Sequence, residues 1–318
     1  MSGSTTHGTA WLQDAKVWIA GHTGLAGSAI TRRFTEHGVG ALITRRSADL
    51  DLLDQQAAWS FLEDQRPDVI VMAAGTVGGI AANVAAPGTF LYENLVMNAN
   101  VIEGARRVGV RKLVLLGSSC VYPRAAAQPM TEDLILTGAL EPTNQGYAVA
   151  KIAAMELARG YRAEHGMDAI TLTPCNLYGP GDDFDSERSH VLSALLRRVH
   201  QAKLDDAAEV VVWGTGTPRR EFLHVNDLAD ATLHLTGTYS SEGHVNVGSG
   251  TDVSIRELAT LIADVVGWQG ELRFDETKPD GMPRKLLDVT QLAELGWDRA
   301  RPLRDGITDT YAWFLQQD

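Results

Sequence analysis

The chain has 318 residues, 44% of them hydrophobic and 21% charged, with a formal net charge of −12. This composition suits a globular protein with one large or two smaller cores, and an acidic chain without a basic tract is not built for non-specific nucleic-acid binding. The two cysteines, Cys120 and Cys175, are too few for a disulfide framework, and no apolar run reaches the ~18 residues of a membrane-spanning helix. We expect a cytoplasmic protein without a metal, and with neither nucleic acid nor membrane as a partner.

The chain opens with a predicted disordered leader over residues 1–14, which are mostly small and polar. The first apolar strand, Lys16–Ala20, then runs into three glycines, Gly21, Gly24 and Gly27, ahead of a predicted helix over residues 28–37. Glycines between a strand and a helix permit a tight turn and let a pyrophosphate approach the helix N-terminus. A plain turn is the alternative, but the position between strand and helix favours a dinucleotide site.

The end of the second predicted strand, residues 40–44, indicates which dinucleotide binds. NAD sites place an acidic residue there to hold the ribose diol, whereas this chain has Arg45 and Arg46. Two guanidinium groups suit the 2′-phosphate of NADP, and the alternative is a solvated basic turn. The sequence therefore predicts NADP(H) as the cofactor.

Strands and helices continue to alternate up to about residue 174. Further strands are predicted over residues 68–74, 111–117 and 168–174, and helices over residues 55–65, 90–108 and 148–165. Alternation of this kind indicates an α/β fold with a doubly wound parallel sheet of the Rossmann type.

The character of the chain changes after Pro174. An acidic loop over residues 181–188 precedes a predicted helix over 191–202, a strand over 209–213, a strand over 244–248 and a helix over 255–266 that Ser254 caps. We expect a nucleotide-binding domain over residues 15–175, to which residues 221–250 return. Residues 176–220 and 251–318 are expected to form a smaller, interleaved substrate domain that closes over a cleft.

Tyr147 and Lys151 form the first candidate catalytic pair. They are four residues apart on a predicted helix and so share one face. An ammonium beside a phenol favours the phenolate, so we expect Lys151 to lower the pKa of Tyr147 into a useful range for acid/base chemistry. Ser118 or Ser119 would hydrogen-bond a substrate carbonyl and the phenol.

Cys120 and His190 are candidates for a second kind of chemistry. Cys120 follows the two serines and would place a second proton-transfer group near the phenol, although a lone cysteine is often a buried structural residue. His190 begins the predicted helix that borders the cleft, and a structural histidine is its alternative.

Several motifs together resemble one known family. They include Gly117-Ser-Ser-Cys-Val-Tyr-Pro123, Glu141-Pro-Thr-Asn144, Asn176-Leu-Tyr-Gly-Pro180, Ser189-His-Val191, Val212-Trp-Gly-Thr-Gly-Thr-Pro218, Arg220-Glu-Phe-Leu-His-Val225 and Lys278-Pro-Asp-Gly-Met-Pro-Arg-Lys-Leu-Leu-Asp288. Their order and spacing, from about residue 16 to 317, are similar to those of the GDP-L-fucose synthases, which are extended short-chain dehydrogenase/reductases. The resemblance implies a homodimer that converts the GDP-sugar GDP-4-keto-6-deoxy-D-mannose with NADPH.

The resemblance also assigns residue roles. Ser118, Tyr147 and Lys151 match the family's reductive set, and Cys120 and His190 match its epimerisation pair. The positions that match contacts to the GDP-sugar are Arg198, Trp213, Arg220, Asp280 and Lys285. Those that match the cofactor site are Gly21, His22, Thr23, Gly24, Leu25, Ala26, Gly27, Arg45, Arg46, Ala73, Ala74, Leu116, Gly117, Lys151, Pro174, Cys175, Asn176, Leu177 and His190.

The implied reaction needs two proton-transfer groups. A C4 ketone acidifies the protons on C3 and C5, and inversion requires a proton to leave one face and another to arrive on the opposite face. Cys120 would remove the protons and His190 would deliver them, while Ser118 and Tyr147 stabilise the enolate oxygen. Reduction of C4 by NADPH then ends with protonation by Tyr147.

Three features depart from the family pattern. Gly75-Thr76 stands where a lysine is expected, Gln145-Gly146 stands where Glu-Pro is expected, and the loop 181–188 is unusually acidic. These departures leave the catalytic groups intact and the exact sugar open. The implied function has three alternatives. They are the same chemistry on a related keto-sugar nucleotide, as in GDP-L-colitose synthesis, an epimerase without productive reduction, and a non-catalytic protein that senses NADP.

Overall fold

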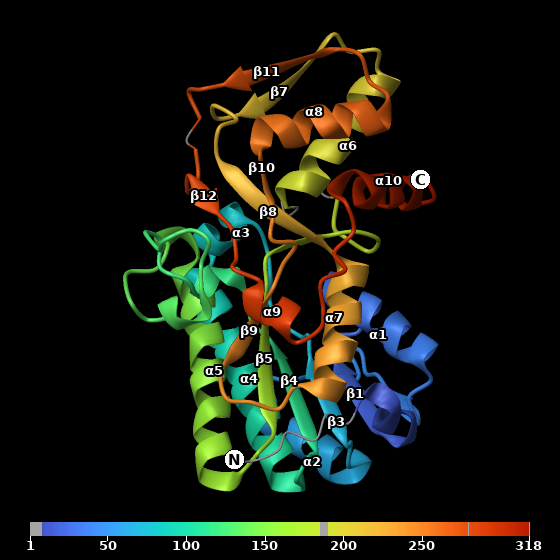
Figure 1. Cartoon of the computed structure of the whole chain (residues 1–318), viewed down its shortest axis with the longest axis vertical. Helices are drawn as coiled ribbons and strands as arrows, with labels where there is room; N and C mark the ends of the chain where they lie inside the picture. Colours follow the sequence, from blue (N-terminus) through green and yellow to red (C-terminus); the bar gives the residue numbers. More distant parts are fainter. Residues whose placement is uncertain (1–7, 185–189, 279, 318) are drawn as a thin grey trace.

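A computed structural model describes residues 8–184, 190–278 and 280–317 of the chain. Figure 1 shows two lobes stacked along the long axis, a large lobe built on one sheet and a small lobe above it. The first half of the predicted leader, residues 1–7, and the acidic residues Asp185 and Glu187 lie outside the described residues.

The large lobe is built on a six-stranded sheet with the order β2-β1-β3-β4-β5-β9. Every pairing between neighbours in it is parallel. The strands are β1 (Lys16–Ala20), β2 (Ala41–Ile43), β3 (Val69–Met72), β4 (Lys112–Leu116), β5 (Ala169–Pro174) and β9 (His244–Val247). Every residue of β3, β4 and β5 is buried, as expected for parallel strands covered on both faces. The predicted doubly wound α/β fold is confirmed.

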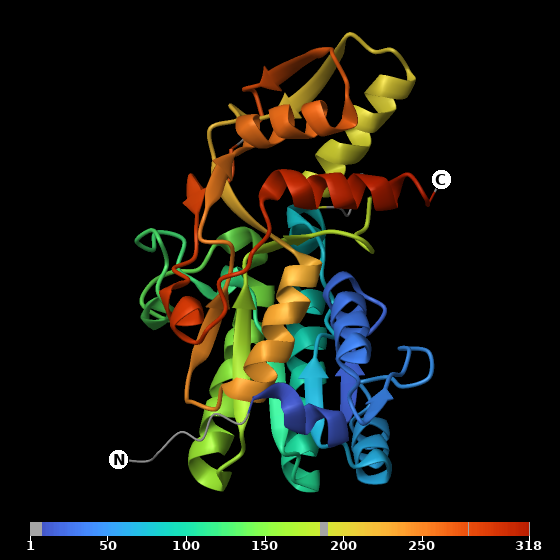
Figure 2. The same cartoon turned by 45° about the vertical axis from the view of Figure 1, so that its right-hand side comes forward.

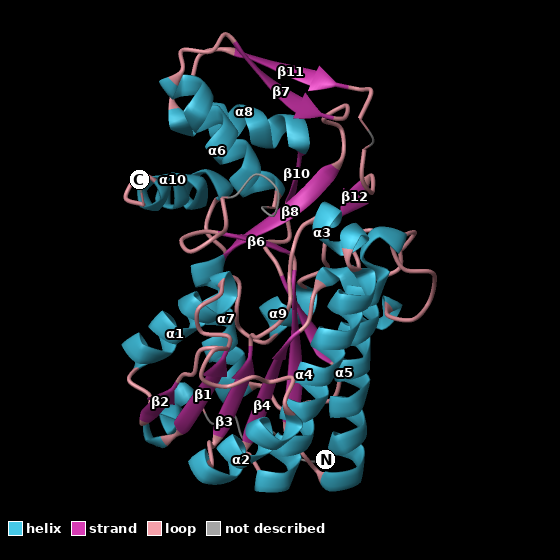
Figure 3. Cartoon of the chain, turned by 180° about the vertical axis from the view of Figure 1, so that it is seen from behind, coloured by secondary structure: helices cyan, strands magenta, loops and turns pink. Residues whose placement is uncertain are grey.

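Helices cover both faces of this sheet (Figure 3). Helices α2 (Gln55–Gln65), α4 (Pro87–Val108) and α5 (Gln145–His165) bury one apolar core, which includes Leu62, Ile102 and Ala158. Helices α1 (Leu25–His37) and α7 (Val225–Thr238) bury most of the other, which includes Phe34 and Leu228.

The structure corrects the predicted leader. Residues Thr9–Asp14 form a 3-10 helix, η1, that packs against α7. Leu12 is fully buried, and the Trp11 indole donates a hydrogen bond to the Gly237 carbonyl (3.4 Å). Two large apolar side chains within a polar stretch were enough to fix residues 9–14 to the large lobe.

The small lobe has its own core and its own sheets (Figure 2). Strand β8 (Arg219–His224) pairs with β10 (Asp252–Ser254), β12 (Arg284–Lys285) and β6 (Asn176–Tyr178), and β7 (Glu209–Trp213) pairs with β11 (Glu271–Asp275). Helices α6 (Val191–Leu204), α8 (Ile255–Val266) and α10 (Leu303–Phe314) bury the third core around Leu196, Ile262 and Ile307. The short helices α3 (Ile80–Ala85) and α9 (Thr290–Glu294) lie on connecting segments.

The chain passes between the lobes several times. Strand β8 still belongs to the small-lobe sheet, so the return to the large lobe begins with α7 at Val225 rather than at residue 221. Strand β9 then adds to the edge of the large sheet beside β5.

None of the helices in the described ranges is long and apolar enough to cross a membrane.

Helices α1 and α5 each begin three residues earlier than predicted. Gly24 is the N-cap of α1 and Asn144 that of α5. Gly146 lies in the first turn of α5, where an added Cβ would stand 2.7 Å from the Pro87 carbonyl oxygen of α4. The glycine that departs from the family pattern therefore lets the two helices approach closely.

Candidate active site

The glycine turn after β1 is shaped by close backbone contacts. Gly21 has a φ of +82°, and a Cβ on it would lie 2.5 Å from the Ala74 amide nitrogen at the end of β3. A Cβ on Gly27 would lie 2.0 Å from the Gly21 carbonyl oxygen, so α1 could not start here with a side chain at that position. No side chain caps the N-terminus of α1, and its free N–H groups suit a pyrophosphate.

The other predicted cofactor residues lie at the same edge of the sheet. Ala73 and Ala74 follow β3, Gly117 follows Leu116 at the end of β4, and Cys175 follows Pro174 at the end of β5. Ligands of doubly wound sheets bind at this edge, outside the carboxyl ends of the strands. Asn176 and Leu177 continue into β6, and the Asn176 amide donates to the Glu221 carbonyl (2.7 Å).

Arg45 and Arg46 are exposed just after β2. The Arg45 guanidinium lies 5.6 Å from the centre of the Phe61 ring and donates to the Thr44 carbonyl (2.8 Å). Neither arginine forms an ion pair among the described residues, so both guanidinium groups are available for an anion. This donor set fits the 2′-phosphate of NADP.

Ser118, Cys120 and Tyr147 form a cluster above β4. Ser118 is the N-cap of the 3-10 turn η2 (Ser119–Val121), where its hydroxyl accepts the Cys120 N–H (3.3 Å), and it hydrogen-bonds the Tyr147 phenol. Ser119 is buried, 4% exposed, which leaves Ser118 as the serine that faces the phenol.

The prediction that Lys151 lowers the pKa of Tyr147 is wrong for this structure. Burial raises the pKa of Tyr147 above its ordinary value, a nearby Cys120 charge raises it further, and the Ser118 hydrogen bond opposes both. Lys151 is 4% exposed, burial lowers its own pKa to about 8, and its ammonium donates to the Leu116 carbonyl (2.8 Å). The phenol therefore carries its proton near neutral pH and is suited to act as an acid.

Cys120 has two polar partners that the sequence did not suggest. The Asn144 amide nitrogen lies 3.1 Å from its sulfur and the Lys285 ammonium 3.6 Å from it, on the other lobe. Cys120 is a free, half-buried thiol rather than a core residue. Asn144 stood within the Glu141-Pro-Thr-Asn144 motif, but nothing in its spacing pointed to the sulfur.

His190 stands apart from this cluster. It is the exposed N-cap residue of α6, and its electrostatic partner is Asp182. Burial raises the pKa of Asp182, while the Ser193 hydroxyl, which donates to it, and His190 oppose that shift. The hydrogen bonds of the described residues do not join His190 to Ser118, Cys120 or Tyr147.

The remaining predicted substrate residues line the small lobe. Trp213 is 67% exposed at the end of β7, which excludes a core role. The Arg220 guanidinium donates to the Met282 carbonyl (2.6 Å), and Asp280 accepts the Thr215 hydroxyl (2.7 Å). Arg198 on α6 donates to the Val211 carbonyl (2.7 Å). These side chains surround the β7–β8 turn, whereas Lys285 points away to Cys120.

Gly75 lies next to Lys151. A Cβ on Gly75 would stand 2.9 Å from the Asn94 side-chain oxygen and 3.9 Å from the Lys151 ammonium. The Asn94 side-chain amide also forms two hydrogen bonds to the backbone of Thr76. It accepts the Thr76 N–H (3.1 Å) and donates to the Thr76 carbonyl (2.9 Å). The lysine expected here is thus replaced by a tightly packed turn.

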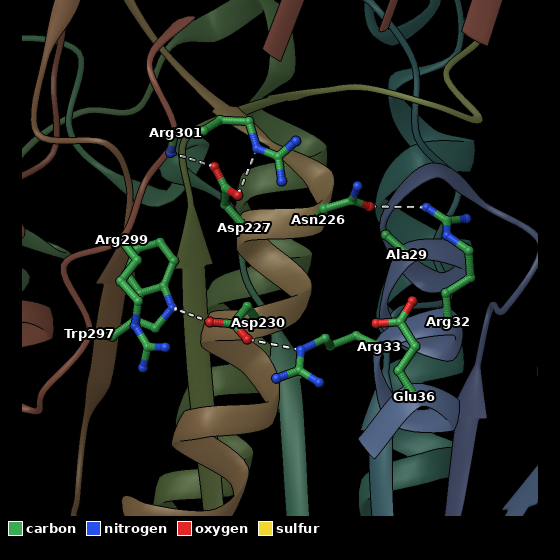
Figure 4. Close-up of a pocket in the computed structure, with 10 residues that line it drawn as sticks. All are labelled: Ala29, Arg32, Arg33, Glu36, Asn226, Asp227, Asp230, Trp297, Arg299 and Arg301. Carbon is green, nitrogen blue, oxygen red and sulfur yellow. Dashed lines mark hydrogen bonds and ion pairs between the residues drawn. The ribbon is translucent and has the colours of Figure 1, made fainter. Parts of the chain in front are cut away.

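A cavity of about 350 Å³ lies elsewhere, between α1, α7 and residues 297–301 (Figure 4). Arg33 pairs with Asp230 (2.9 Å), and Arg301 pairs with Asp227 through both its side chain and its backbone N–H (2.9 Å each). The Trp297 indole also donates to Asp230 (3.1 Å). The cavity lining does not include Ser118, Cys120, Tyr147 or Lys151. We interpret its charges as the attachment of the C-terminal segment to α7.

Comparisons with known proteins agree with this geometry. Residues 17–248 match the model of the NAD dependent epimerase/dehydratase family. The chain is 53% identical to GDP-L-fucose synthase 1 of Arabidopsis thaliana, covering 96% of this chain and 94% of the relative. It is 48% identical to GDP-L-fucose synthase of Escherichia coli, with coverages of 95% and 97%. A GDP-L-fucose synthetase of Naegleria fowleri solved with NADP superposes with a TM-score of 0.88 at 29% identity, with coverages of 96% and 95%.

Proposed function

The chain belongs to the NAD dependent epimerase/dehydratase family, and we propose that it is an NADPH-dependent GDP-L-fucose synthase. It converts GDP-4-keto-6-deoxy-D-mannose to GDP-L-fucose by epimerisation at C3 and C5 and reduction at C4. The observation that carries this proposal is the cluster of Ser118, Tyr147 and Lys151 with a free thiol, Cys120, beside the phenol.

NADP(H) is the cofactor. The glycine turn around Gly21 and the N-terminus of α1 fit the pyrophosphate, and Arg45 and Arg46 fit the 2′-phosphate. When bound, NADPH supplies the hydride that reduces C4. We propose that Lys151 holds the ribose next to the nicotinamide, because its ammonium already lies at the end of β4 against the Leu116 carbonyl.

For epimerisation we propose that Cys120 and His190 act from opposite faces of the sugar. The C4 carbonyl oxygen would receive hydrogen bonds from Ser118 and Tyr147, which stabilise the enolate that forms when a C3 or C5 proton leaves. Cys120 accepts that proton, and His190 delivers one to the other face. His190 comes from the small lobe, so this step needs the two lobes to close on the sugar.

For reduction we propose that Tyr147 protonates the new C4 alkoxide. Burial keeps the phenol protonated near neutral pH, and this is the state that an acid must have before it donates. Lys151, with a pKa lowered to about 8, has its ammonium 5.7 Å from the centre of the Tyr147 ring and would hold the ribose of the cofactor when it is bound.

We propose that the small lobe binds the GDP moiety. Arg198 and Arg220 supply guanidinium groups for the diphosphate, Trp213 offers an exposed ring to the base or sugar, and Asp280 closes the β7–β8 turn. In this proposal, residues 15–175 with the α7–β9 return form the NADP-binding domain. Residues 176–220 and 251–318 then form the substrate domain.

We propose a homodimer that forms through α4 and α5, which pack against each other on one face of the large sheet. Tyr92 and Leu95 of α4 and Val149 of α5 are exposed apolar side chains, with Tyr92 63% exposed. A patch of this kind favours a protein interface. Sedimentation of a Tyr92→Glu/Leu95→Glu variant should give monomers if the proposal is right.

We also propose the cytoplasm as the compartment of the protein, which agrees with its two free cysteines.

One incubation tests the function. The protein is mixed with GDP-4-keto-6-deoxy-D-mannose and NADPH in deuterated water, and the sugar product is examined by NMR. Deuterium at C3 and C5 with a reduced C4 is the expected result. Reduction without deuterium would remove Cys120 and His190 from catalysis, and exchange without reduction would indicate an epimerase alone.

The alternative substrate is a related GDP-keto-deoxy sugar, as in GDP-L-colitose synthesis. The replacement of the expected lysine by Gly75 beside Lys151 is the observation that keeps this alternative open. Competition between the two keto-sugars at equal concentration separates them by their ratio of kcat/KM. A non-catalytic NADP sensor would show no NADPH oxidation with either sugar.

A further inference from the structure

Lys285 lies against the catalytic sulfur rather than among the other substrate residues. Its ammonium is 3.6 Å from the Cys120 sulfur, and the Asn144 amide approaches the same sulfur to 3.1 Å. No carboxylate among the described residues pairs with Lys285. Among the described residues, the hydrogen-bond partner of the ammonium is this sulfur atom. A cation in that position stabilises the thiolate more than the neutral thiol.

We propose that Lys285 and Asn144 hold the Cys120 sulfur as a thiolate, so that Lys285 is a positioning residue of the base. This inference rests on the proposed role of Cys120 in epimerisation. It differs from the role that the sequence resemblance gave to Lys285, which was a contact to the GDP-sugar.

The backbone after Lys285 is fixed to the large lobe on several sides. The Leu286 N–H donates to the Gln128 side chain (2.8 Å), and the Leu286 carbonyl accepts the Met130 N–H (2.8 Å). The Asp288 N–H donates to the Met130 carbonyl (2.8 Å), and its own carbonyl accepts the Asn246 amide (3.1 Å). These hydrogen bonds fix the backbone beside Lys285 and so restrict the positions that its side chain can reach. This lowers the entropy cost of the contact between its ammonium and the Cys120 sulfur.

A buried carboxylate anchors the same segment from the small-lobe side. Glu221 is fully buried in β8 and accepts the Leu287 N–H (2.9 Å) and the Gly250 N–H (2.7 Å). Strand β12, which carries Lys285, pairs with β8 at Arg220. The ammonium therefore arrives from the small-lobe sheet while the sulfur belongs to the large lobe. Both lobes hold the Lys285 segment, and its contact with the sulfur is already formed in this structure.

The proton balance of the step is simple. The Cys120 thiol loses its proton to solvent, and Lys285 keeps all of its own. The thiolate lone pair then takes a proton from C3 or C5, and the electrons of that C–H bond move into the enolate. His190 returns a proton to the opposite face and regains one from solvent, while Cys120 releases the proton that it accepted.

The test measures the thiol directly. The rate of alkylation by iodoacetamide is followed as a function of pH, with the modified Cys120 peptide quantified by mass spectrometry so that Cys175 does not contribute. In Lys285→Met we expect alkylation near neutral pH to be about 10-fold slower and the whole profile to move to higher pH. Lys285→Arg should restore most of the wild-type profile because it returns the charge.

Controls separate this role from folding and from substrate binding. Lys203→Met removes an ammonium from α6, whose Nζ donates to the Val266 carbonyl (2.6 Å), and should leave the profile unchanged. If Lys285→Met does not fold, Lys285→Gln keeps most of the side-chain stem and should give the same displaced profile. An unchanged profile in the charge-removing variants, with only a higher KM for the GDP-sugar, would overturn the proposal and restore the diphosphate role. Because alkylation needs no substrate, failure of the wild type to turn over GDP-4-keto-6-deoxy-D-mannose would count against the proposed function alone.

Discussion

The groups proposed for reduction come from one lobe, whereas those proposed for epimerisation come from both. Ser118, Tyr147 and Lys151 all come from β4, its following turn and α5, and Lys151 is almost completely buried. Cys120 is in contact with Lys285 of the small lobe, and His190 begins a small-lobe helix with its side chain exposed. The reductive set is preorganised within one lobe, whereas the epimerising set is assembled from two.

This difference indicates how one site can run two reactions in order. In the proposed mechanism Lys285 already meets Cys120, whereas His190 would have to approach the sugar from the small lobe, so its proton delivery would be tied to closure. Proton donation to C4 depends on groups that are already in place. If this difference is real, single substitutions should remove one reaction and leave the other.

Replacing the phenol should separate the two reactions most clearly. In Tyr147→Phe we expect C4 reduction to fall by up to ~10⁴-fold, the upper range for loss of a general acid. Exchange at C3 and C5 should persist at a reduced rate, because Cys120 and Ser118 remain. NADPH oxidation at saturating substrate and NMR of recovered sugar measure the two. Retained turnover would exclude Tyr147 as the acid.

Replacing the thiol should do the opposite. In Cys120→Ser we expect deuterium incorporation at C3 and C5 to fall by about 10³-fold, because a serine hydroxyl is a far weaker base. NADPH affinity, measured by fluorescence titration, should stay within about 2-fold since the glycine turn and Arg45 are untouched. Wild-type exchange in this variant would show that another group removes the protons.

The buried lysine predicts a pH dependence of stability. Its pKa is about 8 in the folded chain and 10.5 ordinarily, so the unfolded chain holds the proton more strongly. Burial of the charge thus costs stability below pH 8, on the order of 3 kcal/mol, and the cost disappears as the pH rises toward 10.5. Urea denaturation without added cofactor should show wild type gaining stability over that window relative to Lys151→Met. Parallel curves for the two would mean that burial does not shift the pKa of Lys151.

The smallest effect is expected at the cofactor ribose. Arg45→Ala should lower the preference for NADPH over NADH by about 10-fold, because one of the two exposed guanidinium groups proposed to bind the 2′-phosphate is lost. The ratio of kcat/KM for the two cofactors measures it. Neither reaction of the sugar should be favoured over the other by this change, and an unchanged ratio would place the phosphate elsewhere.

The sequence predicted those parts of the molecule that depend on local pattern. The strand, glycine and helix order around Gly21 determined the nucleotide fold, and the four-residue spacing of Tyr147 and Lys151 placed them on one helix. The motifs predicted the resemblance to the GDP-L-fucose synthases, and the chain is 53% identical to one such relative and 48% identical to another.

What the sequence could not supply depends on distant packing. One of the two polar partners of Cys120 is Lys285, which is 165 positions away along the chain. The proton state of Tyr147 follows from burial, which spacing does not encode. Residues 9–14 were misjudged because Leu12 and Trp11 count for little in a polar stretch until α7 covers them.

The position of β9 has a consequence for synthesis on the ribosome. Strand β5 ends at Pro174, but its neighbour β9 begins roughly 70 residues later, at His244. At the usual pace of translation this leaves the edge of β5 unpaired for several seconds, with its N–H and C=O groups open to other chains. A nascent chain whose synthesis stops before β9 would therefore be prone to aggregate through the open edge of β5. Chaperone binding should be strongest while residues 175–243 are being made.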